Sequence, residues 1–483
     1  MSAPPALPPA PTTSSKKALP CILLGCGALL LLGIVVLGGA AFWYFSARSG
    51  GGSSGGGQAS GEDLGFGAKL SQYDKAGGSA CVITPDGTWH AVFQERSDYG
   101  KPVFIFHRFS RDNGATWSAT ENISNDGSGN GAGFPKLVRD TQGNVYAAWI
   151  RFGGDGSAVT DVTLDGPGGY RAGTLTLRRW SGGHWGPLQT LGTARKVASF
   201  CFFSGADGAP HVLWMDEGGV MAQAASGGGN NGMVAPAADI PMDNPLQHPS
   251  GLSAMSSSRG NLMFTAERKF DNMQQLVFWS SGGLRVLASD PKYETRNNFN
   301  HPAQMFADRG GRLHVIYEPH PKLTERQELW DIDPASGRHQ VIFTGRTGEE
   351  TIQSFQVAAE NGVAQVIMEW SAKPAIVAQS TELVALSFNG TWSEARGLTG
   401  NSRAEKFFFK DMPLASDIAM STNYHAKHAS AAMDTDGKVH LLGTIEALST
   451  FGSSSLERLG GRNYKVTSVG SVGQPSLYVI KWR

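Results

Sequence analysis

The sequence predicts an all-β fold, a β-propeller of four-stranded blades, preceded by one N-terminal transmembrane helix. The first observation is a unit of two short apolar strands joined by a glycine turn, which occurs seven times along the chain. The second is the composition, because 63 Gly, 24 Pro and only 17% charged residues suit many short strands and turns. The glycines of these turns are Gly87, Gly143, Gly208, Gly260, Gly311, Gly362 and Gly437.

Three segments are predicted before the propeller. Residues 1–18 are rich in proline and predict a disordered cytoplasmic tail. Residues 19–45 carry no charge and are long enough to cross a hydrocarbon core of about 30 Å as a helix. Lys16 and Lys17 precede this segment, so the positive-inside rule makes it a signal anchor with a cytoplasmic N-terminus. A cleaved signal peptide ending near Ala40 is the alternative. Residues 46–63 predict a Gly/Ser linker, and residues 64–483 the propeller.

The first repeat predicts strands at 80–85, 88–95, 102–109 and 116–123, which make one antiparallel blade. Seven units predict seven blades, and a six-bladed ring with a separate extra sheet is the alternative. Insertions are predicted at 152–172, 400–427 and 446–474, and large loops on a rigid scaffold are common places for binding function. Residues 475–483 predict a third strand without a fourth. Residues 67–73 are predicted to supply that outer strand and close the ring.

An octapeptide at residues 110–117 lies between the third and fourth strands of the first repeat. It matches the S-x-D-x-G-x-T-W pattern, the Asp box, through Ser110, Asp112, Gly114, Thr116 and Trp117. The chain therefore resembles the sialidase-like (BNR repeat) β-propellers. The resemblance implies that the Asp box lies on the opposite face from an active site. Its residues are expected to shape a turn, with Asp bonding the backbone and Trp packing between blades.

Functional side chains are expected on the other face, where second strands end and where the chain enters each new blade. Carboxylates, guanidiniums and imidazoles gathered around a concave mouth suit a polar ligand such as a sugar. The catalytic candidates are His301, His428, Arg296, Tyr293 and Glu318. The ligand-binding candidates are Arg151, His248, Glu267, Arg268, His425 and Glu369.

Two enzyme classes use these residue types. The resemblance implies a sialidase, which clamps a carboxylate with three arginines and uses a tyrosine nucleophile. The family's R-I-P motif is absent, however, because the nearest string at residues 133–136 lacks the arginine. A polysaccharide lyase needs a His or Tyr base beside an arginine, and residues 293–301 and 423–428 together supply these types. Since no complete catalytic motif is present, the main prediction is recognition of a glycan or protein ligand. Carbohydrate-active catalysis is the alternative.

The charge balance and the cysteine content bear on which partners and cofactors are predicted. The chain carries 41 basic and 41 acidic residues, so nucleic acid is not a predicted partner. The sequence has no C-x-x-C spacing, and neither a metal nor a cofactor is predicted. Cys81 and Cys201 are predicted to be buried free thiols. The predicted partners are the lipid bilayer, through residues 19–45, and a glycan or protein ligand. The predicted location is a single-pass membrane protein with a periplasmic or cell-surface propeller.

Overall fold

The computed structural model describes residues 68–73, 76–97, 101–125, 127, 131–152, 173–191, 199–205, 208–216, 219–226, 232–241, 250–257, 260–271, 273–291, 302–319, 327–345, 350–372, 380–397, 423–459, 462–471 and 476–480. All of them belong to one compact unit, residues 59–483. The predicted tail, transmembrane segment 19–45 and linker lie outside the described residues. Within the described ranges, no helix is long and apolar enough to cross a membrane.

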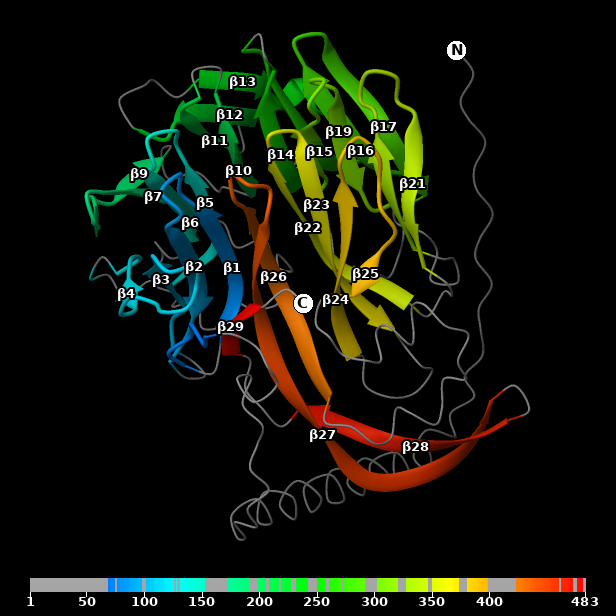
Figure 1. Cartoon of the computed structure of the whole chain (residues 1–483). Coiled ribbons are helices and arrows are strands. Elements are labelled where there is room, and N and C mark those ends of the chain that lie inside the picture. Colours follow the sequence, from blue (N-terminus) through cyan, green and yellow to red (C-terminus); the bar gives the residue numbers. More distant parts are fainter. Residues whose placement is uncertain are drawn as a thin grey trace, which may run out of the picture. The chain divides into compact units, whose positions relative to one another are not determined.

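The described part of the chain is built from antiparallel sheets, with one short 3-10 helix, η1 (Ala237–Asp239), after β13 (Figure 1). Each sheet is formed by strands that follow one another along the chain. Sheet by sheet, the strands are β1 (Ala76–Ile83), β2 (Trp89–Glu95), β3 (Phe104–Ser110) and β4 (Glu121–Asn122); β5 (Ala132–Arg139), β6 (Val145–Arg151), β7 (Thr174–Ser181), β8 (His184–Trp185) and β9 (Gln189–Leu191); β10 (Ser199–Ser204), β11 (Pro210–Asp216), β12 (Gly219–Ala224) and β13 (Gly232–Pro236); β14 (Ser250–Ser256), β15 (Leu262–Phe270), β16 (Met273–Ser280) and β17 (Gly283–Pro291); β18 (Gln304–Ala307), β19 (Leu313–Tyr317), β20 (Glu328–Ile332) and β21 (His339–Thr344); β22 (Glu350–Glu360), β23 (Val363–Ala372), β24 (Ser380–Phe388) and β25 (Arg396–Gly397); and β26 (Asn423–Met433), β27 (Val439–Leu459), β28 (Arg462–Ser471) and β29 (Ser476–Ile480).

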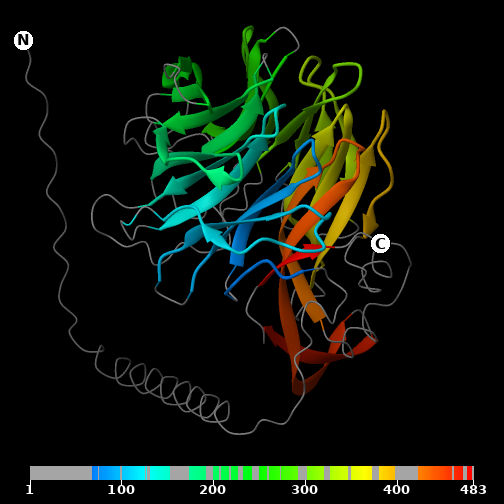
Figure 2. The same ribbon diagram turned by 60° about the vertical axis from the view of Figure 1, so that its left-hand side comes forward.

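The first strands of successive sheets contact one another in chain order, from β1 through β5, β10, β14, β18 and β22 to β26, and β26 contacts β1. Figure 2 shows the sheets following one another in this order. This closed sequence of contacts confirms the predicted all-β propeller of four-stranded blades.

The number of four-stranded blades differs from the prediction of seven. In the described residues six sheets have four strands each, and the sheet β5–β9 has five. Its fourth position is split, because β8 and β9 both pair with β7. Gly186 N still donates to Arg179 O of β7 at 2.8 Å, and the break falls at Pro187 and Leu188, because proline has no N–H to continue the ladder.

The predicted closure of the ring is confirmed. β29 pairs with β27 as its third strand, and the residues before β1 lie alongside β29. Leu70 N donates to Leu477 O at 2.7 Å, and Leu477 N donates to Ser71 Oγ at 3.0 Å. Residues from the start and the end of the described chain therefore share one sheet, which leaves no open edge there.

Two of the predicted insertions contain residues that form strands. Residues 423–427 belong to β26, and most of 446–474 forms a hairpin in which β28 pairs with the second half of β27 (Figure 1). The predicted insertion at 152–172 lies outside the described residues, apart from Phe152. Sequence reasoning missed the hairpin because its Ser- and Gly-rich strands carry a weak apolar alternation.

The turns between first and second strands have the predicted conformation. All seven repeat glycines have positive φ, between 73° and 84°. A residue with a Cβ is strained in this region, which explains why glycine recurs at this position of each unit.

The Asp box forms the compact turn expected from its sequence. Asp112 Oδ1 accepts hydrogen bonds from Ser110 Oγ and Thr116 N, both at 2.8 Å, and Ser110 Oγ accepts from Gly114 N. Trp117 Nε1 donates to Gly114 O at 3.1 Å, and its ring packs edge-on against Trp89. Trp117 also contacts the apolar cluster that includes Leu442 and Leu477 of the last sheet, so it packs between blades as predicted.

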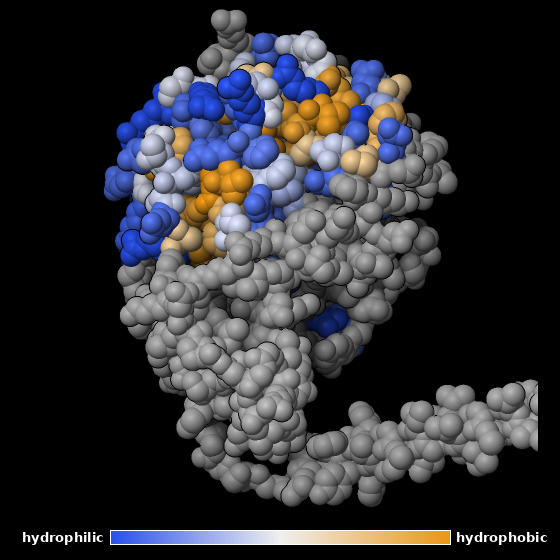
Figure 3. Space-filling model, turned by 90° about the vertical axis from the view of Figure 1, so that its right-hand side faces the viewer, coloured by the Kyte–Doolittle hydropathy of each residue, from blue (hydrophilic) through white to orange (hydrophobic). Residues whose placement is uncertain are grey.

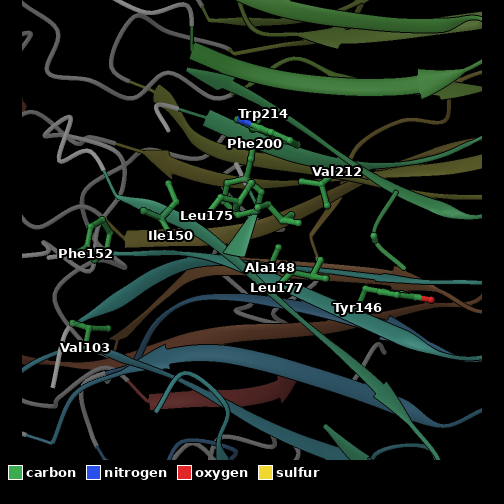
Figure 4. Packing of buried hydrophobic residues seen from close by; sticks show 12 residues of the cluster. Val103, Tyr146, Ala148, Ile150, Phe152, Leu175, Leu177, Phe200, Val212 and Trp214 are labelled. Carbon is green, nitrogen blue, oxygen red and sulfur yellow. The ribbon is translucent and has the colours of Figure 1, made fainter. Parts of the chain in front are cut away.

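Apolar side chains fill the spaces between neighbouring sheets. Figure 4 shows one such cluster, in which Ala148 and Leu177 from one sheet meet Phe200, Val212 and Trp214 from the next. The large exposed hydrophobic residues among those described are Met233, Val286 and Val341, on the outer strands β13, β17 and β21. On the face shown in Figure 3, hydrophobic residues lie among hydrophilic ones, as expected where strand edges meet solvent.

Candidate functional site

Five of the charged residues at the ends of the second strands are buried, whereas Arg96 and Arg151 are half-buried. Glu95 and Glu267 have no exposed surface, and Arg268, Glu318 and Glu369 are at most 5% exposed. The sequence predicted charged groups gathered around a concave mouth, and these five side chains lie in the interior instead of being exposed. Burying a charge is costly unless it is hydrogen-bonded, so their partners indicate what they do.

Four polar residues near the ends of second strands form a repeat that sequence reasoning missed. Gln94, Glu267, Glu318 and Glu369 each lie seven residues after the turn glycine of their sheet. Gln94 Oε1 accepts from Phe134 N at 3.0 Å, and Glu369 Oε1 accepts from Ala429 N at 3.3 Å. Both acceptors reach the first strand of the next sheet at a β-bulge, where backbone N–H groups leave the ladder. Glu369, a ligand-binding candidate, thus joins two blades.

The next position in the strand faces the other way, because side chains alternate along a strand. Glu95 accepts from the backbone N–H groups of Gln72 and Tyr73 beside the last sheet. Arg268 donates from Nη1 to Pro241 O, in the segment after the preceding sheet, and from Nε to Gln275 Oε1 at 3.0 Å. Burial lowers the pKa of Arg268. Glu267 and Arg268 therefore face different neighbouring sheets and do not converge.

One group of titratable residues lies between the sheets β14–β17 and β18–β21. Tyr317 on β19 has no exposed surface, and its hydroxyl donates to Asp290 Oδ2 on β17 at 3.1 Å. Burial raises the pKa of Tyr317 well above 10, and the charges of Glu267, Asp290 and Glu318 raise it further. The phenol is therefore a hydrogen-bond donor at neutral pH. Strand alternation directs Glu318 to the other face of its strand.

We call Glu267, Asp290 and Tyr317 the carboxylate–tyrosine cluster. Gln274 Nε2 donates to Glu267 Oε2 at 3.3 Å, and Asp290 is half-buried. Of the three residues, the sequence had singled out Glu267 as a ligand-binding candidate. Asp290 was missed, although its position directly before the 292–301 segment was a usable signal.

The described residues on either side of 292–301 lie beside this cluster. The segment 292–301 follows β17 directly, and Pro302 comes after it. Gly251, with a φ of 65°, packs between the cluster and Pro302, because a Cβ built there would lie 3.1 Å from Pro302 Cα and 3.3 Å from Glu267 Oε1. A side chain at position 251 would push Pro302 away from Glu267. The candidates Tyr293, Arg296 and His301 belong to this segment and lie outside the described residues.

Within the described part of the chain, none of the remaining candidates lies at the carboxylate–tyrosine cluster. Arg151 ends β6 in another sheet and is half-buried. The backbone of His425 and His428 lies in β26, but their side chains, and His248, are outside what the structure describes. In the described part of the chain, no group of three or more His, Cys, Asp or Glu side chains is arranged to hold a metal ion.

Cys81 and Cys201 are free thiols, as predicted, but each residue is half-buried and not fully buried. Burial raises the pKa of both to about 12. Both thiols are therefore protonated at neutral pH, which makes them poor nucleophiles.

No protein-family model matches the chain, and no curated protein matches it. Solved structures with similarity include the polysaccharide lyase Uly1, at 11% identity over 64% of this chain and 77% of that chain, with a TM-score of 0.39. The NanB sialidase from Streptococcus pneumoniae is similar at 11% identity over 86% and 70% of the two chains, with a TM-score of 0.38. The alpha-L-arabinofuranosidase Arb93A from Fusarium graminearum is similar at 12% identity over 86% and 96%, with a TM-score of 0.38.

Similarities at this level carry no argument about activity. The chain has a β-propeller fold with an Asp-box turn, and this conclusion rests on its own sheet order and hydrogen bonds.

Proposed function

We propose that the protein is a carbohydrate-active β-propeller whose site lies at the carboxylate–tyrosine cluster. The observation that carries the proposal is the convergence of Glu267 and Asp290 with the hydroxyl of Tyr317, close to Pro302. Carboxylates and a phenol hydrogen-bond sugar hydroxyls, and paired carboxylates are the common acid and base of glycoside chemistry.

The accessibility of the cluster suggests a different role for each residue. Asp290 is half-buried, whereas Glu267 and Tyr317 have no exposed surface. Asp290 is therefore the group best placed to take a proton from a bound sugar or to give one. Tyr317 acts on Asp290 as a positioning residue, since its protonated hydroxyl holds one carboxylate oxygen. Tyr293, Arg296 and His301 are the candidates for contacting the sugar.

An activity assay on the full chain in detergent micelles tests this proposal. Sialosides, uronate-containing polysaccharides and neutral polysaccharides are incubated with the protein, and new reducing ends and unsaturated uronates are measured. Asp290→Asn should lower turnover by about 100-fold or more, the usual size of a general acid or base contribution. Glu394→Gln removes an exposed carboxylate elsewhere and should leave turnover unchanged. Equal turnover in wild type and Asp290→Asn would contradict the assignment.

Recognition without turnover is the second candidate function. It is favoured by the burial of Glu267 and Tyr317, because groups that brace neighbouring sheets shape a rigid binding surface. Binding of a polysaccharide that yields no product, weakened in Asp290→Asn, would support recognition over catalysis.

Residues 19–45 are proposed to anchor the protein in a membrane, with the N-terminus cytoplasmic and the propeller on the other side. The support is the uncharged length of this segment and the lysines before it. The protein should stay with membranes during alkaline extraction, and a chain lacking residues 1–45 should not. Release of the full chain by alkali would contradict the anchor.

A further inference from the structure

A polar pocket lies at the opposite end of the strands from the carboxylate–tyrosine cluster. It has a volume of about 220 Å³ and lies between the first two sheets. Its wall is made by the glycine turns at 84–88 and 142–144 and by the third-to-fourth-strand turn at 181–183. The side chains of His90, Phe109, Arg111 and Trp180 complete it. A cavity of this size takes a small ligand, because sites for drug-sized molecules begin at about 300 Å³.

A buried chain of hydrogen bonds leads to this pocket from the second sheet. Trp185 Nε1 donates to His107 Nδ1 at 3.1 Å, and His107 Nε2 is 3.1 Å from His90 Nδ1. Tryptophan can only donate, so His107 Nδ1 is the acceptor and its proton is on Nε2. His107 then donates to His90 Nδ1. The network thus assigns the proton of His90 to Nε2 and makes that nitrogen a donor.

Both histidines are neutral at physiological pH. Burial lowers the pKa of His90 to about 4 and lowers the pKa of His107 well below 6.5. The rings of His90 and His107 stack at 5.3 Å, and Trp180 packs against both. The donor of His90 is therefore held in a fixed orientation by side chains from two sheets.

Two charged side chains flank His90 in the pocket. Asp86 Oδ1 accepts from the Thr84 hydroxyl and from Thr88 N, and the bond from Thr84 contributes most to lowering the Asp86 pKa. Asp86 is therefore an ionised acceptor. Arg111, on the Asp-box turn, stacks over the ring of Phe109 at 5.2 Å. The charges of Asp86 and Arg111 act on His90 with opposite signs, so both lie near it.

We propose that this pocket is a second carbohydrate-binding site, which takes a single sugar ring on the Asp-box face. The pocket offers an acceptor in Asp86 and donors in His90 and Arg111, and the buried ring of Trp180 closes its wall. A ligand that fits must be small and must both donate and accept hydrogen bonds. The hydroxyl groups of a sugar do both.

Binding is measured on the full chain in detergent micelles by ligand-observed NMR and calorimetry. The probes are galactose, glucuronic acid and N-acetylneuraminic acid, with glycine and inorganic phosphate for comparison. Asp86→Asn and Arg111→Gln should each weaken binding of at least one sugar by about tenfold or more.

Matched controls separate this site from charge effects and from the proposed active site. Asp436→Asn changes the residue before the turn glycine in another sheet, and Arg338→Gln changes an exposed arginine on another third-to-fourth-strand turn. Both controls, and Asp290→Asn, should leave this binding unchanged. The proposal is overturned if no sugar binds, if only glycine or phosphate binds, if Asp86→Asn and Arg111→Gln bind as wild type does, or if Asp290→Asn abolishes the same binding.

Discussion

Alanine at Gly362 should destabilise the propeller more than alanine at Gly437, although the two glycines hold equivalent turn positions. Their φ angles are 73° and 80°. A Cβ at Gly437 would meet no atom within 4 Å, whereas one at Gly362 would lie 2.3 Å from Arg309 N and 2.7 Å from Arg309 Cα. Arg309 belongs to the glycine turn of the preceding sheet, so relief requires that turn to shift.

The expected costs follow from these contacts. Left-handed backbone costs a residue with a Cβ about 1–2 kcal/mol, and loss of unfolded-state freedom returns about 0.4–1 kcal/mol. Gly437→Ala should therefore lower the free energy of unfolding by about 1 kcal/mol. Gly362→Ala adds an overpacking cost of about 1–3 kcal/mol, for a total of about 2–4 kcal/mol.

Equilibrium unfolding in urea measures both variants on the same preparation, with wild type as the reference. The difference between the variants isolates the contact between sheets, because the backbone cost is common to both. Equal destabilisation by Gly362→Ala and Gly437→Ala would show that the turns of neighbouring sheets do not pack as described.

Two further predictions concern named hydrogen bonds. Hydrogen bonds from Thr116 and Ser110 lower the pKa of Asp112 from 3.8 to about 2. The stabilisation by Asp112 is therefore present above about pH 3.8 and is lost as the pH falls through about 2, so the gap in urea midpoint between wild type and Asp112→Ala should close over that range. Glu369→Ala leaves Ala429 N without its acceptor and should cost about 1–3 kcal/mol in urea unfolding, whereas Glu369→Gln keeps an acceptor and should cost less. Equal costs for the two Glu369 variants would contradict the inter-blade bond.

Features set by a few neighbouring residues were predictable from the sequence. The glycine turns depend on the backbone angles that glycine allows, and the Asp box depends on bonds within eight residues. The closing strand was also predictable, since the chain end lacked a fourth strand and residues 67–73 had no other sheet to join. The five-stranded sheet was not predictable, because the division of its fourth strand into β8 and β9 depends on a single proline in an outer strand.

The candidate site was predicted less well because burial depends on contacts between sheets. Sequence reasoning did not check whether the strand-end carboxylates recur at one position of the repeat. Glu369 has the same spacing from its glycine as Gln94, and both join the next sheet. Asp290 contacts a tyrosine 27 residues away on another sheet, a pairing that no local pattern encodes.

The two proposed sites share one construction, in which polar side chains from adjacent sheets meet at a strand end. Tyr317 bonds Asp290 between the sheets β14–β17 and β18–β21, and Trp185 bonds His107 between the first two sheets. The hydrogen bonds described for the two groups involve different residues, and the groups lie at opposite ends of the strands in different sheets. Distant sites without shared partners give additive free energies, so the effects of Asp86→Asn and Asp290→Asn on urea unfolding should add within about 0.5 kcal/mol. A larger coupling would show that the sheets transmit strain from one site to the other.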